Sequence, residues 1–262
     1  MPAPTVSLFI NLSESFEYLA HAPISEAVFQ IRGRATTAWD ETTVLAAIKA
    51  QLPNYPKVDS QRIQQITLQN TKEQPSPVVD LGWNGAVART KDALQVANFH
   101  RDTFSFSRLS PYETWEKFSD EAFRLYQIHL DLARPAEVQR LGLRFINQFP
   151  VPATSFELED YFTEPPSAYA GLPLERGVFF HQDTFSVPGH PYRVTVIRTF
   201  QPPFNHAGLV MPPKLILDID VSTDAPQIID LAQIRIRLHE MRWIKNKVFF
   251  GSLTPSAINA FK

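Results

Sequence analysis

The chain contains no cysteine among its 262 residues. This absence excludes disulfide bonds, thiol nucleophiles and cysteine-ligated zinc or iron–sulfur sites, and it fits a reducing compartment, so we expect a cytoplasmic protein. Glycine is also scarce, with 9 residues against 22 prolines. Neither GxGxxG nor GxxxxGK[ST] occurs in the sequence, which weakens any interpretation as a nucleotide-binding protein.

Neither sign of charge dominates the sequence, and no long apolar run is present. The 25 lysines and arginines stand against 27 aspartates and glutamates, for a net charge of -2, so no overall field would attract a phosphate backbone or an anionic membrane. The apolar run near the N-terminus is too short for a secretion signal or a membrane span. A hydrophobic fraction of 44% favours a single globular unit over residues 1–262, without cofactor or membrane.

Residue periodicity predicts alternating strands and helices in the first half of the chain. The expected strands are 22–34, 62–70, 78–90 and 93–109. Asp40 is expected to cap a short helix, and Pro111 to start a long helix that ends near residue 134. Trp115 and Phe118 begin the apolar stripe of the long helix, so both are expected to be buried.

The second half repeats this order of elements. Strand 138–149 is followed by a short helical candidate at 155–162, by strands at 177–187, 192–200 and 213–223, and by a long helix at 226–248. The order β, α, three β, α therefore occurs twice, in halves 20–134 and 137–250. One half alone would leave a sheet edge and a sheet face bare. We expect an α+β fold in which duplicated halves share an antiparallel sheet with two long helices on one face. A saddle like that of the TATA-binding protein is the closest shape, and a helix-grip fold is the alternative.

Four segments carry a resemblance to a known family. They are APISEAVFQIR (22–32), FSFSRLSPYETWEKF (104–118), RLGLRFINQFPVP (140–152) and LHEMRWIKNKVFFGSLT (238–254). In this order the segments resemble a sporadically distributed bacterial family of unknown function whose members have about this length. The resemblance spans nearly the whole chain. It implies a free-standing bacterial protein and assigns no activity or catalytic residue.

Arginines on two strands form a candidate anion site. Alternation places Arg32 and Arg34 on the polar face of the first strand, and Arg144 on the polar face of 138–149. If the halves pair through these strands, the three guanidinium groups meet on one surface, where they can grip an anion in bidentate fashion. Such a cluster needs compensation by a bound anion, by aspartates of this chain, or by an acidic partner surface.

A pair of carboxylates and the start of one helix are further candidate functional sites. Asp218 and Asp220 project from one face of strand 213–223; they could divide acid and base roles or bind Mg²⁺, or they could pair with arginines such as Arg198. Arg108 ends a strand just before the long helix, whose first N–H groups could hold an anion beside it, unless the junction only anchors the helix.

Two other polar features have structural interpretations. His181, His190 and His206 with Asp183 would suit a transition metal, but their spacing matches no established site pattern; no metal is expected. Asn147 falls on the apolar face of its strand, and we expect its amide to satisfy backbone groups.

No convergent catalytic set is visible, and this favours a non-enzymatic binding or regulatory protein. It would engage a protein or an anionic ligand through the sheet face or a long helix. One alternative is an enzyme acting on a small phosphorylated or carboxylated substrate, with Asp218, Asp220 and the strand arginines in one cleft. The other is a nucleic-acid binder, suggested by the saddle and by basic residues mixed with aromatics; the isoelectric point near 6.4 counts against it.

Overall fold

The computed structural model describes residues 7–66, 78–153, 155–166, 177–206, 208–224 and 230–262. It is an α+β fold built on a large antiparallel sheet of nine strands in the order β2-β3-β4-β5-β1-β6-β11-β8-β7. These strands are β1 (Ile24–Arg32), β2 (Lys57–Ile66), β3 (Val78–Arg89), β4 (Gln95–His100), β5 (Thr103–Leu109), β6 (Arg140–Pro150), β7 (Phe180–Ser186), β8 (Arg193–Gln201) and β11 (Lys214–Thr223). A separate two-stranded sheet joins β9 (Phe204–His206) and β10 (Leu209–Met211).

The helices start where side chains cap their free N–H groups. Asp40 accepts from the Thr43 N–H at the start of α1 (Glu41–Gln51), and Thr114 accepts from the Lys117 N–H at the start of α2 (Trp115–Ala133). The other elements are the 3₁₀ turn η1 (Leu158–Asp160), α3 (Leu231–Ser252) and α4 (Pro255–Asn259). No helix in the described ranges is long and apolar enough to cross a lipid bilayer.

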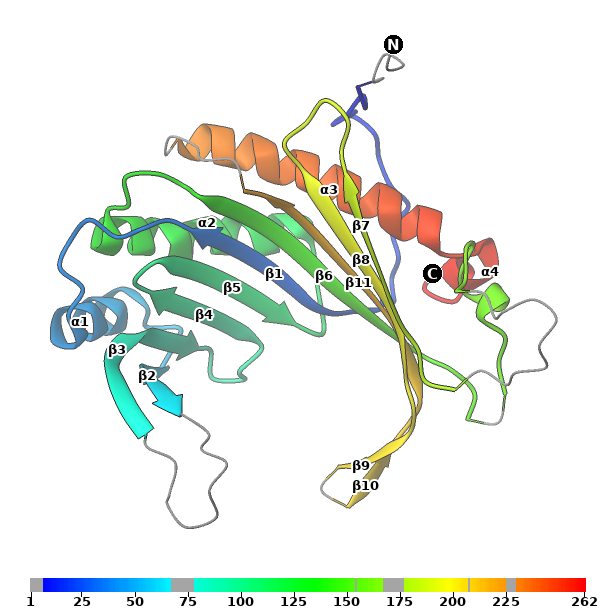
Figure 1. Ribbon diagram of the computed structural model, residues 1–262, viewed down its shortest axis with the longest axis horizontal. Helices are drawn as coiled ribbons and strands as arrows, with labels where there is room; N and C mark the ends of the chain where they lie inside the picture. Colours follow the sequence, from blue (N-terminus) through cyan, green and yellow to red (C-terminus); the bar gives the residue numbers. More distant parts are fainter. Residues whose placement is uncertain (1–6, 67–77, 154, 167–176, 207, 225–229) are drawn as a thin grey trace.

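The central pair of the sheet is β1 and β6, which run antiparallel with Val28 opposite Arg144 and Arg32 opposite Arg140. Strands β5, β4, β3 and β2 follow on the β1 side, and β11, β8 and β7 follow on the β6 side. The two halves of the chain therefore meet in the middle of one sheet, and each half continues outward from that pair (Figure 1).

Both long helices cover the same face of this sheet (Figure 1). The ring of Phe118 in α2 stacks on Phe106 of β5, with centroids 5.5 Å apart, and contacts Phe145 of β6 at 6.0 Å. Lys245 of α3 lies over the same Phe145 ring. Trp115 and Phe118 are buried, which confirms the apolar stripe read from the sequence.

An irregular N-terminal segment, residues 7–23, runs from the turn between β7 and β8 along α3 to the start of β1 (Figure 1). The Leu8 N–H donates to the Pro188 carbonyl at one end, and the His21 N–H donates to the Phe261 carbonyl at the other. Between these points Glu14 accepts from the Trp243 indole N–H at 2.8 Å and pairs with Lys247. Hydrogen bonds and an ion pair thus hold the segment at both ends and in the middle, so it packs as an integral part of the fold.

Several expected boundaries differ from the structure. Segment 93–109 forms two strands, because the chain turns at Arg101–Asp102, so the first half contributes five strands to the sheet. The second strand is earlier than expected, at 57–66, and residues 67–70 lie outside the described ranges. The candidate helix at 155–162 is only the 3₁₀ turn η1.

Both long helices also begin later in the sequence than the expected starts at residues 111 and 226. Pro111 precedes α2, which begins at Trp115 because Thr114 provides the cap. The last long helix runs over Leu231–Ser252 after its cap at Asp230, and residues 226–229 lie outside the described ranges. Arg34 was expected to belong to the first strand, but it lies beyond the end of β1 at Arg32.

Candidate functional site

The arginines of the central strands lie on the sheet face opposite the helices. Cross-strand partners share a face, so Arg32 opposite Arg140 and Val28 opposite Arg144 place these three arginines together. This confirms the strand phase predicted for Arg32 and Arg144. Arg32 and Arg34 are exposed and make no ion pair with a described residue.

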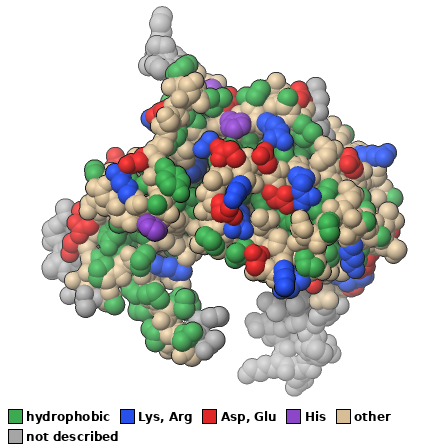
Figure 2. Space-filling view, turned by 180° about the vertical axis from the view of Figure 1, so that it is seen from behind, with side chains coloured by type: hydrophobic (Ala, Val, Ile, Leu, Met, Phe, Trp, Pro, Cys, Tyr) green, Lys and Arg blue, Asp and Glu red, His purple; other side chains and the backbone are tan. Residues whose placement is uncertain are grey.

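Ion pairs to the aspartates of β11 compensate Arg140 and Arg144. Arg144 grips Asp218 in bidentate fashion, with Nε 2.8 Å from Oδ1, and this carboxylate raises the pKa of Arg144. Arg140 lies 3.0 Å from Asp220, whose pKa is raised chiefly by burial. The carboxylates therefore pair with these neighbours and not with Arg198, whose partner is Asp183. The arrangement is a structural charge network between β6 and β11. Figure 2 shows the side of the molecule that faces away from the viewer in Figure 1, and there basic and acidic side chains are interspersed without a large field of one sign.

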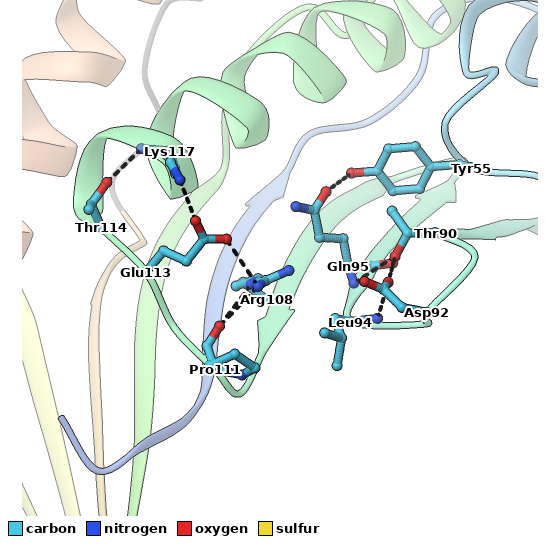
Figure 3. Close-up of polar contacts among 10 residues, drawn as sticks. All are labelled: Tyr55, Thr90, Asp92, Leu94, Gln95, Arg108, Pro111, Glu113, Thr114 and Lys117. Atoms are coloured by element: carbon cyan, nitrogen blue, oxygen red, sulfur yellow. Dashed lines mark hydrogen bonds and ion pairs between the residues drawn. The ribbon is translucent and has the colours of Figure 1, made fainter. Parts of the chain in front are cut away.

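Arg108 joins β5 to the start of α2 from the helix side of the sheet (Figure 3). Its guanidinium donates to the Pro111 carbonyl at 3.0 Å and reaches Glu113 at 3.2 Å. Glu113 also pairs with Lys117, and Thr114 caps the helix. Groups of this chain thus engage Arg108, and the Thr114 side chain caps the Lys117 N–H at the helix start, as the anchoring interpretation of this junction expects.

The histidines of the second half do not converge. His181 lies 3.6 Å from Asp183 and contacts Arg198, whereas His190 bonds to the Leu8 carbonyl at 2.7 Å. The His206 side chain lies outside the described set. No group of three metal-ligating side chains occurs among the described residues.

A cavity of about 860 Å³ lies on the helix side of the sheet. Its walls are the N-terminal segment between residues 12 and 24, the β5–α2 junction at 110–116, Phe145 and Asn147 of β6, and the face of α3 between residues 239 and 250. This volume falls within the range of cavities that hold small molecules.

Lys245 of α3 lines this cavity and is buried, with 8% of its surface exposed. Its Nζ lies 4.1 Å from the centre of the Phe145 ring, and no described residue offers it a hydrogen bond or ion pair. Burial, and then the positive charge of Arg242, lower the pKa of the Lys245 ammonium to about 7. A buried lysine with such a pKa is typical of a functional site more than of a structural contact.

Tyr112 and Asn147 flank the same aromatic ring. The Tyr112 ring packs against Phe145 at 5.6 Å, and burial raises the pKa of its hydroxyl above the ordinary range. Asn147 donates through Nδ2 to the Leu217 carbonyl at 2.9 Å and to the Phe145 carbonyl at 3.4 Å, which confirms its expected backbone role. Its Oδ1 has no partner among the described residues and remains available as an acceptor in the cavity wall.

The charges of the cavity wall leave it with uncompensated cations. Arg242 lies 5.1 Å over the Trp115 ring and, like Lys245, makes no ion pair with a described residue. Most of the acidic side chains in the wall are held by cations outside it. These acidic groups are Glu14 with Lys247, Glu17 with Lys262, and Glu113 with Arg108 and Lys117. Glu116 is the remaining wall glutamate, and it is exposed.

All four sequence segments that carry the family resemblance contribute residues to this cavity. The first supplies Ala22 to Ile24, the second Ser110 to Glu116, the third Phe145 and Asn147, and the fourth all of the α3 wall. Sequence reasoning noticed these segments but did not identify Lys245. The available signal was its position: Lys245 lies four residues after Met241 and seven after Leu238, on the apolar stripe of α3, where a charged residue is out of place.

Neither a protein-family model nor a curated protein sequence matches this chain.

Proposed function

We propose that this protein binds an anionic small molecule with an apolar body in the cavity between β6, α3 and the N-terminal segment. The main observation behind this proposal is Lys245, a buried cation in the cavity wall with no carboxylate partner among the described residues. Burying an uncompensated charge is costly, so a position of this kind is maintained for a ligand more readily than for stability.

Charge and shape both support an anionic ligand. Lys245 and Arg242 both line the cavity from α3 and have no acidic partner among the described residues. The rest of the wall is rich in aromatic side chains, including Phe145, which favours an apolar body. A carboxylate, sulfonate or phosphate attached to a hydrophobic group has this chemistry.

The opposite sheet face supports the other candidate functions less. Arg140 and Arg144 already pair with aspartates, so they offer little to a phosphate backbone or an acidic partner. The same ion pairs engage Asp218 and Asp220, so these carboxylates are less available to act on a substrate. Binding in the helix-side cavity therefore replaces binding by the sheet face in this proposal.

Binding of 1-anilinonaphthalene-8-sulfonate, an anionic aromatic probe, tests the proposal. Trp115 and Trp243 line the cavity, so a probe bound there should quench indole emission as its own fluorescence rises. We expect one saturable site in the folded protein and roughly 10-fold weaker binding by Lys245→Met, which corresponds to about 1.4 kcal/mol. Lys117→Met is the matched control, because Lys117 is 69% exposed and lies outside the cavity wall. Equal binding by Lys245→Met and wild type would refute the site.

We further propose that the two halves are a duplication and that the sheet is a saddle like that of the TATA-binding protein. The support is the strand order, in which β1-β5-β4-β3 and β6-β11-β8-β7 extend in opposite directions from the central pair. Membership in the sporadically distributed bacterial family is likewise proposed, on the four segments that meet at the cavity. Superposition of 20–134 on 137–250 tests the duplication: it must align these strands and bring α2 onto α3.

A further inference from the structure

We propose that Lys245 is a reactive lysine, which condenses through its Nζ with the aldehyde or ketone group of an anionic molecule in the cavity and forms an imine. This inference rests on the proposed function, because it requires that the cavity take up such a molecule. It adds a chemical class to the ligand, a carbonyl compound that also carries an acidic group.

The surroundings of Nζ favour an amine that is free to react. Nζ lies over the Phe145 ring at 4.1 Å, and none of the described carboxylates holds it as an ammonium ion. Its neighbour Arg242 is a cation and makes a second positive charge unfavourable. The lowered pKa of the ammonium, about 7, leaves a large share of the amine unprotonated at neutral pH. Desolvation and a neighbouring cation are the usual means of activating a lysine nucleophile.

The reaction needs only the amine, the carbonyl compound and proton transfers. The nitrogen lone pair attacks the carbonyl carbon, a C–N bond forms, and the π electrons move to the oxygen. A proton then passes from nitrogen to oxygen and gives a carbinolamine. The oxygen then takes a second proton from solvent, the C–O bond breaks as water leaves, and the nitrogen lone pair forms the C=N bond of the protonated imine. Return of the N–H proton to solvent gives the neutral imine. No oxidant or reductant takes part.

Groups in the same wall can hydrogen-bond to the reacting atoms. The Tyr112 hydroxyl can donate a hydrogen bond to the oxygen of the carbonyl group and of the carbinolamine, while solvent water supplies the proton. The free Oδ1 of Asn147 can accept a hydrogen bond from the carbinolamine. Both residues border the Phe145 ring, over which Nζ lies: Tyr112 by ring contact, and Asn147 two positions along the same face of β6.

Reductive trapping tests this assignment. The full chain is incubated with 4-carboxybenzaldehyde, an aromatic aldehyde that carries a carboxylate, and the imine is reduced with cyanoborohydride and mapped by peptide mass spectrometry. We expect modification of Lys245 at least ~10-fold faster than of the exposed Lys117. Excess anilinonaphthalene sulfonate should slow labelling of Lys245 in the wild-type chain and leave Lys117 unaffected, so the conclusion does not depend on a variant that folds.

The variant Lys245→Arg separates this inference from the binding proposal. Arginine keeps the positive charge, so the variant should still bind the sulfonate probe while it loses the trapped product at this position; Lys117→Arg should retain both. If wild-type Lys245 stays unlabelled while 4-carboxybenzaldehyde displaces the probe, the imine is refuted and the binding function stands. If the probe does not bind the folded wild type, both proposals fail.

Discussion

The Nζ atom of Lys245 lies 4.1 Å from the centre of the Phe145 ring, and no carboxylate among the described residues pairs with it. A cation over an aromatic face gains a favourable interaction, on the order of 1–2 kcal/mol when desolvated. That gain is smaller than the cost of burying an ammonium ion, as the lowered pKa of Lys245 shows. At neutral pH the buried ammonium group is therefore destabilising for the folded protein without a ligand.

Replacing this lysine should stabilise the protein. Lys245→Met keeps an unbranched side chain of similar length and removes the buried charge, so we expect the free energy of unfolding to rise by roughly 1–4 kcal/mol at pH 7. Chemical denaturation of both chains in the same buffer measures the difference. A clear loss of stability in the variant would mean that the ammonium group makes a favourable interaction in the folded state.

The same variant should change how stability depends on pH. The pKa of Lys245 is about 7 in the folded chain against an ordinary 10.5, so between these values the unfolded chain binds more protons. Stability of the wild type therefore rises with pH in this window by up to ~1.4 kcal/mol per pH unit relative to Lys245→Met, and the gap between the two closes toward pH 10.5. Denaturation at pH 7.5 and 9 compares the slopes. The titratable and charged groups near the cavity, common to both chains, are Arg242, His239, Tyr112, Glu113, Glu116, Glu14, Glu17 and His21.

The pair between Arg144 and Asp218 should contribute measurably to stability. Asp218 has 8% of its side chain exposed and Arg144 has 46%, so solvent weakens the interaction relative to a fully buried pair. A double-mutant cycle with Arg144→Ala and Asp218→Ala should give a coupling free energy of about 1–3 kcal/mol. The pair Arg89–Asp59 is the control, because Asp59 is 66% exposed; its coupling should stay below ~1 kcal/mol. Equal coupling in the two pairs would contradict the structural role of the first.

The order of elements was largely predictable from the sequence, because strand alternation and helix caps are local signals. Asp40 caps α1 as expected, and the Lys91–Asp92 turn separates β3 from β4. The turn at Arg101–Asp102 was missed, since no glycine or proline marks it and apolar alternation continues on both sides. Strand order beyond the central pair depends on long-range pairing, which no short window contains.

The candidate site was much less predictable. The sequence predicted that Asp218 and Asp220 share one face of their strand and that Arg144 lies on the polar face of β6. Whether these side chains form a ligand site or pair with one another depends on side-chain geometry. The cavity depends on parts of the chain far apart, such as Glu14 and Trp243. Lys245 carried a positional signal, yet a lysine on an apolar stripe also occurs where its end reaches solvent.

Substitution of Trp115 by alanine tests how much the start of α2 contributes to packing and stability. Trp115 is buried, and its ring lies 6.0 Å from Phe118. Trp115→Ala removes this packing and opens more space, so we expect a loss of ~3–5 kcal/mol in the free energy of unfolding. Trp115→Phe retains part of the ring contacts and should lose less. A melting midpoint unchanged by the alanine substitution would show that the start of α2 packs differently.

His129 should make the protein sensitive to acid. It is buried in α2, its Nε2 lies 2.8 Å from the His100 carbonyl, and its Nδ1 has no partner in the described part of the chain. The rings of Trp39, in the loop before α1, and Phe104, in β5, lie 5.7 Å away. Burial lowers the pKa of His129 to about 4, from an ordinary 6.5. The neutral ring with its proton on Nε2 therefore fits this site, and the imidazolium ion does not.

Between pH 6.5 and 4 the unfolded chain binds a proton at residue 129 that the folded chain excludes. Stability should fall with decreasing pH across this window, by ~3 kcal/mol in total from this residue. His129→Phe and His129→Gln both remove the titrating group. In each variant the free energy of unfolding should therefore depend less on pH across this window than in the wild type, whatever its value at pH 7. His100, whose pKa burial also lowers, remains in every chain and contributes equally. Urea denaturation at pH 4.5, 5.5 and 7 gives the comparison, and slopes identical to the wild type in both variants would show that His129 can take up a proton in the folded state.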